Sequence, residues 1–285
     1  MMAGSSVPFR KIAAHRLAVS EPPPQWFGNG ANTGATASGR PWTNGNWLKS
    51  RFHFSFAEYS NPGNAEFGVL RVLNDDLVQP ARGFGRHGHA NMEICTYILE
   101  GDLTHRDSMG NGDTLGRGSV QFMSAGRGVQ HEEHNLDPEA PLRFCQIWIK
   151  PWKHGLDPNY GSFAGTDASL RTNRLQHLVA PATSEDAGVP VKIQADAHIH
   201  VTELTEAGKR VGFDVAEGRQ AYVLQAEGTA SFEGAFGKST LERHDAAEVR
   251  GPVALDITAL EAGAHVLIIE MAAGKGGRTD IPNEL

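Results

Sequence analysis

The chain has 285 residues, which is enough for one or two domains of ordinary size. Its hydrophobic share of 40% and charged share of 21% exclude a wholly disordered chain, and its net charge of −7 disfavours nucleic acid as the main ligand. Two cysteines, Cys95 and Cys145, are too few for a disulfide framework. Neither a secretory signal nor a run of about 18 apolar residues is evident. We therefore expect a cytoplasmic protein, or a nuclear one in a eukaryote, with no membrane partner.

Strand-like segments separated by Gly-rich turns follow one another along the chain. In chain order, the expected strands cover residues 8–13, 52–56, 67–73, 93–99, 120–123, 142–149, 191–193, 198–204, 221–224, 230–232 and 265–271. The segment Asp107-Ser-Met-Gly-Asn-Gly112 is typical of a hairpin tip. Such spacing, without a long amphipathic helix, predicts an all-β sandwich or barrel rather than βαβ units.

Residues 20–46 interrupt this series. They begin with Ser-Glu-Pro-Pro-Pro and continue with Gly, Asn, Thr and Ala, so they have no periodicity and little to bury. We expect a surface loop that Trp26, Phe27 and Trp42 hold against the body of the protein.

A faint internal repeat divides the rest of the chain into two halves. Tyr97-Ile-Leu-Glu-Gly101 resembles Tyr222-Val-Leu-Gln-Ala-Glu-Gly228, and in each case an apolar strand enters a Gly turn that leads to a second strand. The repeat predicts two similar β-barrels in tandem.

Two histidine-rich segments carry the candidate chemistry. Side chains alternate faces along an extended strand, so His87, His89 and Glu93 are expected to point one way. Two imidazoles at this spacing suit a metal site and do not suit a nucleophilic triad. In the second segment, His131 and Glu133 share one face by the same argument, while the residues at 132 and 134 share the other.

The order of these residues resembles the paired motifs of the cupin superfamily. The first motif is Gly83-Phe-Gly-Arg-His-Gly-His-Ala-Asn-Met-Glu93, and the second runs from Gly118 through Ser124-Ala-Gly to His131 and Asn135. Within the cupins the chain resembles the pirin family most closely. The continuation Ile-Cys-Thr-Tyr-Ile-Leu-Glu-Gly after the first motif and the segment Gln-Phe-Met-Ser-Ala-Gly-Arg-Gly in the second carry this likeness. Ser124 and Gly88 stand where the cupin and pirin patterns usually have Pro.

The resemblance implies an all-β fold of two tandem cupin β-barrels of the jelly-roll type. It also implies that His87, His89, His131 and Glu133 bind a metal ion. Other cupins use the glutamate of the first motif, here Glu93, so the residues alone leave five candidates for four positions. The pirin pattern favours Glu133, and Glu93 would then be a carboxylate of the surrounding pocket.

Three imidazoles and one carboxylate form a mixed nitrogen and oxygen site without a thiolate. Such a site suits Fe(II), Cu, Mn, Ni, Co or Zn, and the pirin resemblance implies Fe(II). His198 and His200 form another pair on one face, but no His-x-Glu segment follows them. We therefore expect one metal ion per chain, in the N-terminal half.

These expectations define the domain organisation. Residues 1–46 are an N-terminal strand and an extended loop insertion, and 47–165 are a metal-binding cupin domain. Residues 166–190 are a connection, 191–273 are a metal-free C-terminal cupin domain, and 274–285 are a tail.

The pirin resemblance implies a quercetin 2,3-dioxygenase-like activity, in which O2 opens the central ring of a flavonol and carbon monoxide is released. The metal would lower the pKa of the substrate hydroxyl, and Glu133 would act as the general base. A flat aromatic substrate would pack against barrel-lining side chains, for which the candidates are Phe52, Phe56, Tyr97 and Met123.

The alternative is an iron-dependent, redox-sensing regulatory protein, because animal pirins resemble co-regulators that bind protein partners. The sequence identifies no such partner, and we expect no direct binding of nucleic acid.

Overall fold

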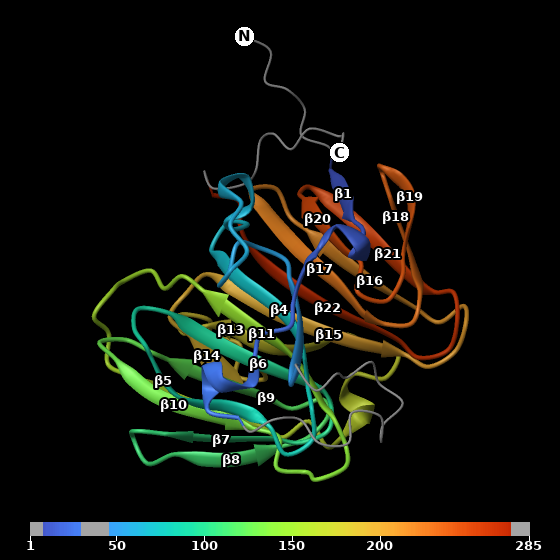
Figure 1. The fold of residues 1–285 in the computed structure, drawn as a ribbon. Coiled ribbons are helices and arrows are strands. Elements are labelled where there is room, and N and C mark those ends of the chain that lie inside the picture. Colours follow the sequence, from blue (N-terminus) through green and yellow to red (C-terminus); the bar gives the residue numbers. More distant parts are fainter. Residues whose placement is uncertain (1–7, 30–45, 275–285) are drawn as a thin grey trace.

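The computed structural model describes residues 8–29 and 46–274, which form β-strands joined by turns and short 3-10 helices (Figure 1). The strands form two seven-stranded and two four-stranded sheets, and each large sheet faces one small sheet. The predicted all-β fold of two cupin barrels is therefore confirmed. In the described part of the chain, no helix is long and apolar enough to cross a membrane.

The N-terminal barrel combines one large and one small sheet. In spatial order, the large sheet contains β12 (Asn159–Phe163), β9 (Val120–Ser124), β6 (Glu93–Glu100), β11 (Leu142–Ile149), β4 (Leu70–Val78), β3 (Leu48–Phe52) and β2 (Ala18–Ser20). The small sheet contains β5 (Gly83–His89), β10 (Val129–His134), β7 (Leu103–Asp107) and β8 (Gly112–Leu115). The turn between β7 and β8 is the predicted hairpin tip.

The C-terminal barrel repeats this arrangement. Its large sheet contains β1 (Phe9–Ile12), β20 (Ala246–Arg250), β17 (Arg219–Glu227), β22 (Ala264–Ala272), β15 (Ala197–Leu204), β13 (Gln176–Pro181) and β14 (Val191–Ile193). Its small sheet contains β16 (Arg210–Val215), β21 (Val253–Ala259), β18 (Ala230–Gly234) and β19 (Gly237–Leu241). The 3-10 helices are η1 (Ala14–Arg16), η2 (Pro24–Phe27), η3 (Pro62–Asn64) and η4 (Ala168–Leu170). Matching the two strand orders places Tyr97 of β6 and Tyr222 of β17 on equivalent strands, as the internal repeat predicts.

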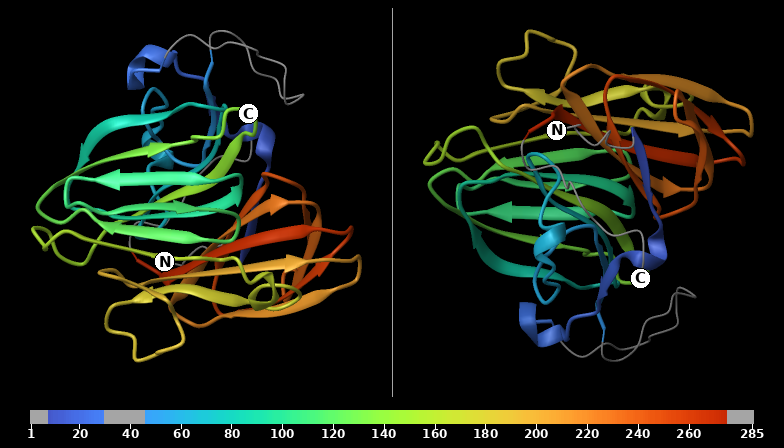
Figure 2. Two further views of the ribbon diagram at one scale, coloured as in Figure 1. Left: turned by 90° about the horizontal axis from the view of Figure 1, so that it is seen from below. Right: turned by 90° about the horizontal axis from the view of Figure 1, so that it is seen from above.

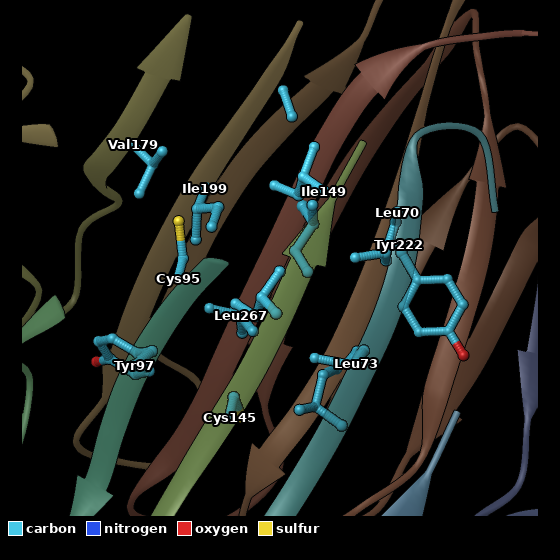
Figure 3. Close-up of a cluster of buried hydrophobic side chains, with 14 of the residues drawn as sticks. Leu70, Leu73, Cys95, Tyr97, Cys145, Ile149, Val179, Ile199, Tyr222 and Leu267 are labelled. Carbon is cyan, nitrogen blue, oxygen red and sulfur yellow. The ribbon is translucent and has the colours of Figure 1, made fainter. Parts of the chain in front are cut away.

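The two barrels lie side by side (Figure 2), with an apolar layer between their large sheets. Cys95 and Tyr97 of β6 and Cys145 of β11 enter this layer from one side, and Tyr222 and Leu267 enter it from the other (Figure 3). All five are fully buried. Because side chains alternate along a strand, the residues between them point into the barrels.

Two tyrosines cross this layer in opposite directions. The Tyr97 hydroxyl lies 2.9 Å from Nε2 of His265 in the C-terminal barrel. The Tyr222 hydroxyl lies 3.0 Å from Nδ1 of His53 in the N-terminal half. Each barrel therefore supplies a hydrogen-bonding side chain to the other across the apolar layer.

A buried ion pair also joins the barrels. Arg143 donates two hydrogen bonds of 2.8 Å to Asp75 and a third of 2.8 Å to the carbonyl of Ala226. His244 of the C-terminal barrel lies 2.6 Å from the same Asp75 carboxylate. Burial alone would raise the pKa of Asp75, but Arg143 and His244 hold it well below its usual value. The carboxylate is thus charged and fully paired.

Some elements differ from the predicted ones. The strand expected over 52–56 ends at Phe52, because the chain turns there and buries both His53 and Phe54. Strand β13 lies within the segment expected to be a connection, since it pairs with β15 as a member of the C-terminal sheet. Strand β1 also pairs with the C-terminal barrel, through β20. The expected tail beyond 274 lies outside the described residues.

We predict that Arg143→Met destabilises the protein by about 3–5 kcal/mol, because the buried Asp75 carboxylate loses its guanidinium partner and keeps only His244. Arg127 is a suitable control. It pairs with Asp157 at the surface, where its side chain is 67% exposed, so Arg127→Met should change stability by less than about 1 kcal/mol. Urea unfolding of both variants measures the difference. Similar losses in the two variants would contradict the role given to the buried pair.

Candidate metal centre

Three histidines of the small N-terminal sheet converge inside the barrel. His87 and His89 lie on β5, and His131 lies on the neighbouring strand β10. The Nε2 atom of His131 lies 3.1 Å from Nε2 of His87 and 3.0 Å from Nε2 of His89. The structure thus brings together the three histidines that the sequence singles out.

The pairing of β5 with β10 explains this convergence. His131 lies opposite His87 in the register, and Val129 lies opposite His89. Along β10, His131 and Glu133 are buried, whereas Gln130 is exposed and Glu132 is partly exposed. The alternation predicted for this segment is confirmed, although a β-bulge interrupts the register with β5 between His131 and Glu133.

The three imidazoles are neutral in this environment. Burial lowers the pKa of His87, and burial together with the neighbouring His87 lowers that of His89 to about 4. The pKa of His131 is also strongly lowered, by burial first and then by the nearby histidines. His87 Nδ1 lies 2.8 Å from the carbonyl of Gly85, which favours the tautomer with a proton on Nδ1 and a lone pair on Nε2.

This donor set fits a transition metal ion. Two ligands at right angles, each about 2.1 Å from a metal, lie about 3.0 Å from each other. The Nε2 separations of 3.0 and 3.1 Å match that value. Neutral imidazoles with nitrogen lone pairs are the form in which histidine binds metals.

Glu133 lies beside this cluster in a cradle of hydrogen bonds. Its carboxylate accepts hydrogen bonds from Gln121 (2.7 Å), Gln146 (3.0 Å) and Thr96 (3.3 Å). Burial raises its pKa to about 7, and these three hydrogen bonds oppose the rise. One carboxylate oxygen of Glu133 and one ring nitrogen from each of His131 and His105 lie within 4.8 Å of one another. Glu133 is therefore a neighbour of His131, one of the three converging imidazoles, and it can gain or lose a proton near neutral pH.

Glu93 takes a different position from the one predicted. The expectation that it shares a strand face with His87 and His89 is wrong, because β5 ends at His89 and a turn with Asn91 at φ +55° precedes β6. The Glu93 carboxylate accepts hydrogen bonds of 2.6 Å from Ser124 and 3.1 Å from the backbone of Gln194. It therefore connects the two barrels and does not join the histidine cluster.

Of the residues expected to line a substrate site, Tyr97 lies apart from Phe52, Phe56 and Met123. Tyr97 faces the layer between the barrels, so its prediction as a lining residue is wrong. Phe56 and Met123 pack against Trp148, which in turn lies beside the histidine cluster. The Trp148 ring is 4.8 Å from that of His89 and 5.3 Å from that of Phe56. Phe52 packs against Phe56 at 5.3 Å.

The N-terminal segment also reaches the centre. The Phe27 ring lies 5.8 Å from that of His87 and 5.7 Å from that of Trp47. Trp26 is 57% exposed and does not hold the segment, while Trp42 lies outside the described residues. Of the aromatic anchors expected in this loop, Phe27 therefore contacts the body of the protein.

A second histidine cluster occurs in the C-terminal barrel. His177 of β13 lies beside His198 and His200 of β15, and ligand atoms of the three lie within 4.8 Å of one another. The sequence singles out His198 and His200 but not His177, because only the pairing of β13 with β15 brings it close.

Other polar residues of the N-terminal barrel were also missed. Thr96, Gln121 and Gln146 hold Glu133, and Asp76 is a further buried carboxyl group whose pKa burial raises to about 7. Each is a polar residue within a largely buried strand, which is the feature that could have identified them.

Comparisons with known proteins cover both barrels. A family model described as Pirin matches residues 35–149, and one described as Quercetinase C-terminal cupin domain matches residues 178–271. A pirin-like protein of Caulobacter vibrioides is 39% identical over 78% of this chain and 92% of its own length. A quercetin 2,3-dioxygenase of Escherichia coli is 46% identical over 44% of this chain and 54% of its own length. The solved structure of the bacterial pirin YhhW from Escherichia coli, in complex with nickel(II), has a TM-score of 0.74 and 27% identity over 93% of this chain and all of that chain.

We predict that metal binding at the N-terminal centre releases a proton from Glu133. In the metal-free protein its pKa is about 7, and a bound cation favours the anion. Release from Glu133 should be nearly complete at about pH 6 and should vanish at about pH 8, because its carboxyl group loses its proton between these values even without metal. Calorimetric titration in buffers of different ionisation enthalpy measures the number of protons. Glu133→Gln should abolish the release, and unchanged release in that variant would contradict the assignment.

Proposed function

We propose that this chain, which belongs to the pirin family, is a metal-dependent dioxygenase that uses O2 to open the ring of a flavonol or a similar aromatic enol. The observation that carries the proposal is the combination of two features in one barrel. Three neutral imidazoles converge there, and a buried carboxyl group with a pKa of about 7, that of Glu133, lies next to one of them, His131.

The proposed ligands are His87, His89, His131 and Glu133, and the proposed ion is Fe(II). The nickel(II) complex of a related pirin supports a site for a divalent transition metal. The Glu133 carboxylate accepts hydrogen bonds from Gln121 and Gln146. To become the fourth ligand, it must give up part of this hydrogen bonding and bind the ion instead. A metal ion held there would supply Lewis-acid charge and the redox chemistry that O2 requires.

The surroundings of His89 support a flat aromatic substrate. The Trp148 ring lies 4.8 Å from His89, with Phe56 and Met123 close to it. Within the described residues, Nε1 of Trp148 is buried without a hydrogen-bond partner, so it is available to donate to a substrate oxygen. Apolar walls with few polar groups are typical of small-molecule sites.

Glu133 is the proposed general base. A base works best when its pKa lies close to the working pH, and burial brings the pKa of Glu133 to about 7 in the metal-free protein, so its carboxylate suits this role when it is not bound to the ion. Gln121 and Gln146 hold the carboxylate in place and stabilise its charged form. Glu133 can therefore accept the proton of an enol that enters the barrel.

The direct test uses iron-loaded protein, quercetin and O2. We expect loss of the visible absorbance of quercetin together with release of carbon monoxide. The double variant His87→Ala/His89→Ala should show neither change, because it lacks two of the proposed ligands. Absence of turnover with Fe(II), Cu, Mn, Ni, Co and Zn alike would reject the dioxygenase proposal and favour a regulatory binding protein.

A comparison of two adjacent glutamates tests the proposed base. We predict that Glu133→Gln lowers the turnover of the metal-loaded protein by about 10²–10⁴-fold, because the amide cannot accept a proton. Its metal content should fall much less, since the three imidazoles remain. Glu132→Gln should leave both nearly unchanged, because the Glu132 side chain lies on the opposite face of β10 and faces His134 at 3.9 Å.

Metal content and quercetin turnover of both variants are measured beside the parent protein. Equal losses in the two variants would contradict the orientation of β10. If Glu133→Gln kept its turnover and Glu93→Gln lost it, the proposed general base would be Glu93, the glutamate that other cupins use.

A further inference from the structure

We propose that His177, His198 and His200 form a second metal site, inside the C-terminal barrel. His177 lies opposite His200 in the pairing of β13 with β15 (strands labelled in Figure 1). Nδ1 of His198 lies 3.1 Å from Nε2 of His177. One ligand atom from each residue lies within 4.8 Å of the other two.

The three rings face the interior of the barrel. On β15, His198 and His200 lie on the same side as Leu204, which belongs to the apolar core of this barrel. Ile199, between them, faces the layer shared with the other barrel. The His200 ring also lies 5.2 Å from that of Phe213 on β16, in the opposite sheet.

This cluster is not a degenerate copy of the N-terminal centre. Matching the strand orders of the two barrels makes β16 and β21 the equivalents of β5 and β10. Neither β16 nor β21 contains a histidine. The C-terminal histidines instead come from β13 and β15, in the facing large sheet. A search for cupin ligands at equivalent positions therefore does not find them.

The chemistry of the cluster suits metal binding. Burial lowers the pKa of all three histidines, and that of His200 falls to about 3, so the rings are neutral. A hydrogen bond joins His177 and His198, and the His200 ring stacks on that of His177 with 4.1 Å between the ring centres. A carboxylate oxygen of Asp186 lies 3.6 Å from Nδ1 of His177. A carboxylate behind an imidazole is the usual arrangement in metal sites, because it fixes the tautomer and increases the basicity of the other nitrogen.

The donor set also indicates the kind of ion. Imidazole nitrogen suits Zn, Cu, Ni and Co and does not suit Mg or Ca, which prefer oxygen. All three rings are partly exposed, and His177 and Asp186 line a cavity of about 330 Å³, so solvent can complete the coordination. Without a directly bound carboxylate, the site should be weaker than the N-terminal one. This proposal replaces the expectation of a metal-free C-terminal barrel, which rested on the lack of a His-x-Glu segment after His198 and His200 and did not consider His177.

The test is equilibrium dialysis of the metal-stripped, full-length chain against Co²⁺, followed by metal analysis and by the visible spectrum of the bound ion. We expect two equivalents in the parent protein. One should remain in His87→Ala/His89→Ala and one in His198→Ala/His200→Ala, with distinct spectra. His154→Ala, which removes an exposed histidine, should retain both.

A single equivalent in the parent protein would overturn the proposal, as would two equivalents in His198→Ala/His200→Ala. Circular dichroism checks that each variant is folded. If the double variant does not fold, His177→Gln on the other strand replaces it, and the same loss of one equivalent is expected. Retention of both equivalents in folded His177→Gln would reject the site.

Discussion

The packing of the two large sheets against each other determines which side chains are available for chemistry. Alternate residues of β6 and β11 must enter the apolar layer between the barrels, as Cys95 and Tyr97 do. The residues between them, such as Thr96 and Gln146, then point into the N-terminal barrel, where both contact Glu133. Fully burying one large apolar side chain contributes about 1.5–3 kcal/mol, so a shift that reversed these faces would be strongly unfavourable. The orientation of the side chains that hold Glu133 therefore follows from the contact between the barrels.

The same packing explains the polar groups that cross it. A charged pair such as Arg143 and Asp75 is costly to bury and is tolerated only when its hydrogen bonds are satisfied. Here Asp75 also meets His244, and Arg143 also meets the carbonyl of Ala226, both from the opposite barrel. Neither barrel can satisfy this pair alone. The contacts thus specify one relative placement of the barrels, which the apolar layer by itself does not.

Local periodicity made a large part of this structure predictable. The β-fold and the opposite faces of Glu132 and Glu133 follow from patterns within single strands, and the doubled barrel follows from the repeat of one such pattern in the second half. The errors arose where the chain changes direction or pairs at long range. The turn at Asn91 separates Glu93 from His89, and the pairing of β13 with β15 brings His177 to His200. Neither the turn nor the long-range pairing leaves a periodic pattern in the sequence. The alternation of faces therefore could not be followed across the turn, and His177 could not be assigned to the pair at 198 and 200.

The two barrels share one topology, yet their histidines come from opposite walls. In the N-terminal barrel the histidines lie on the small sheet, while β4 of the large sheet contributes the buried carboxyl group of Asp76. In the C-terminal barrel the equivalent of β4 is β15, which carries His198 and His200. What the histidine clusters share is therefore not a strand position. Both consist of inward-facing residues at alternate positions, with a partner on the neighbouring strand, in surroundings that keep imidazole neutral. The barrels of this chain offer such positions on both walls, so a cluster of neutral imidazoles requires inward orientation and burial rather than one motif.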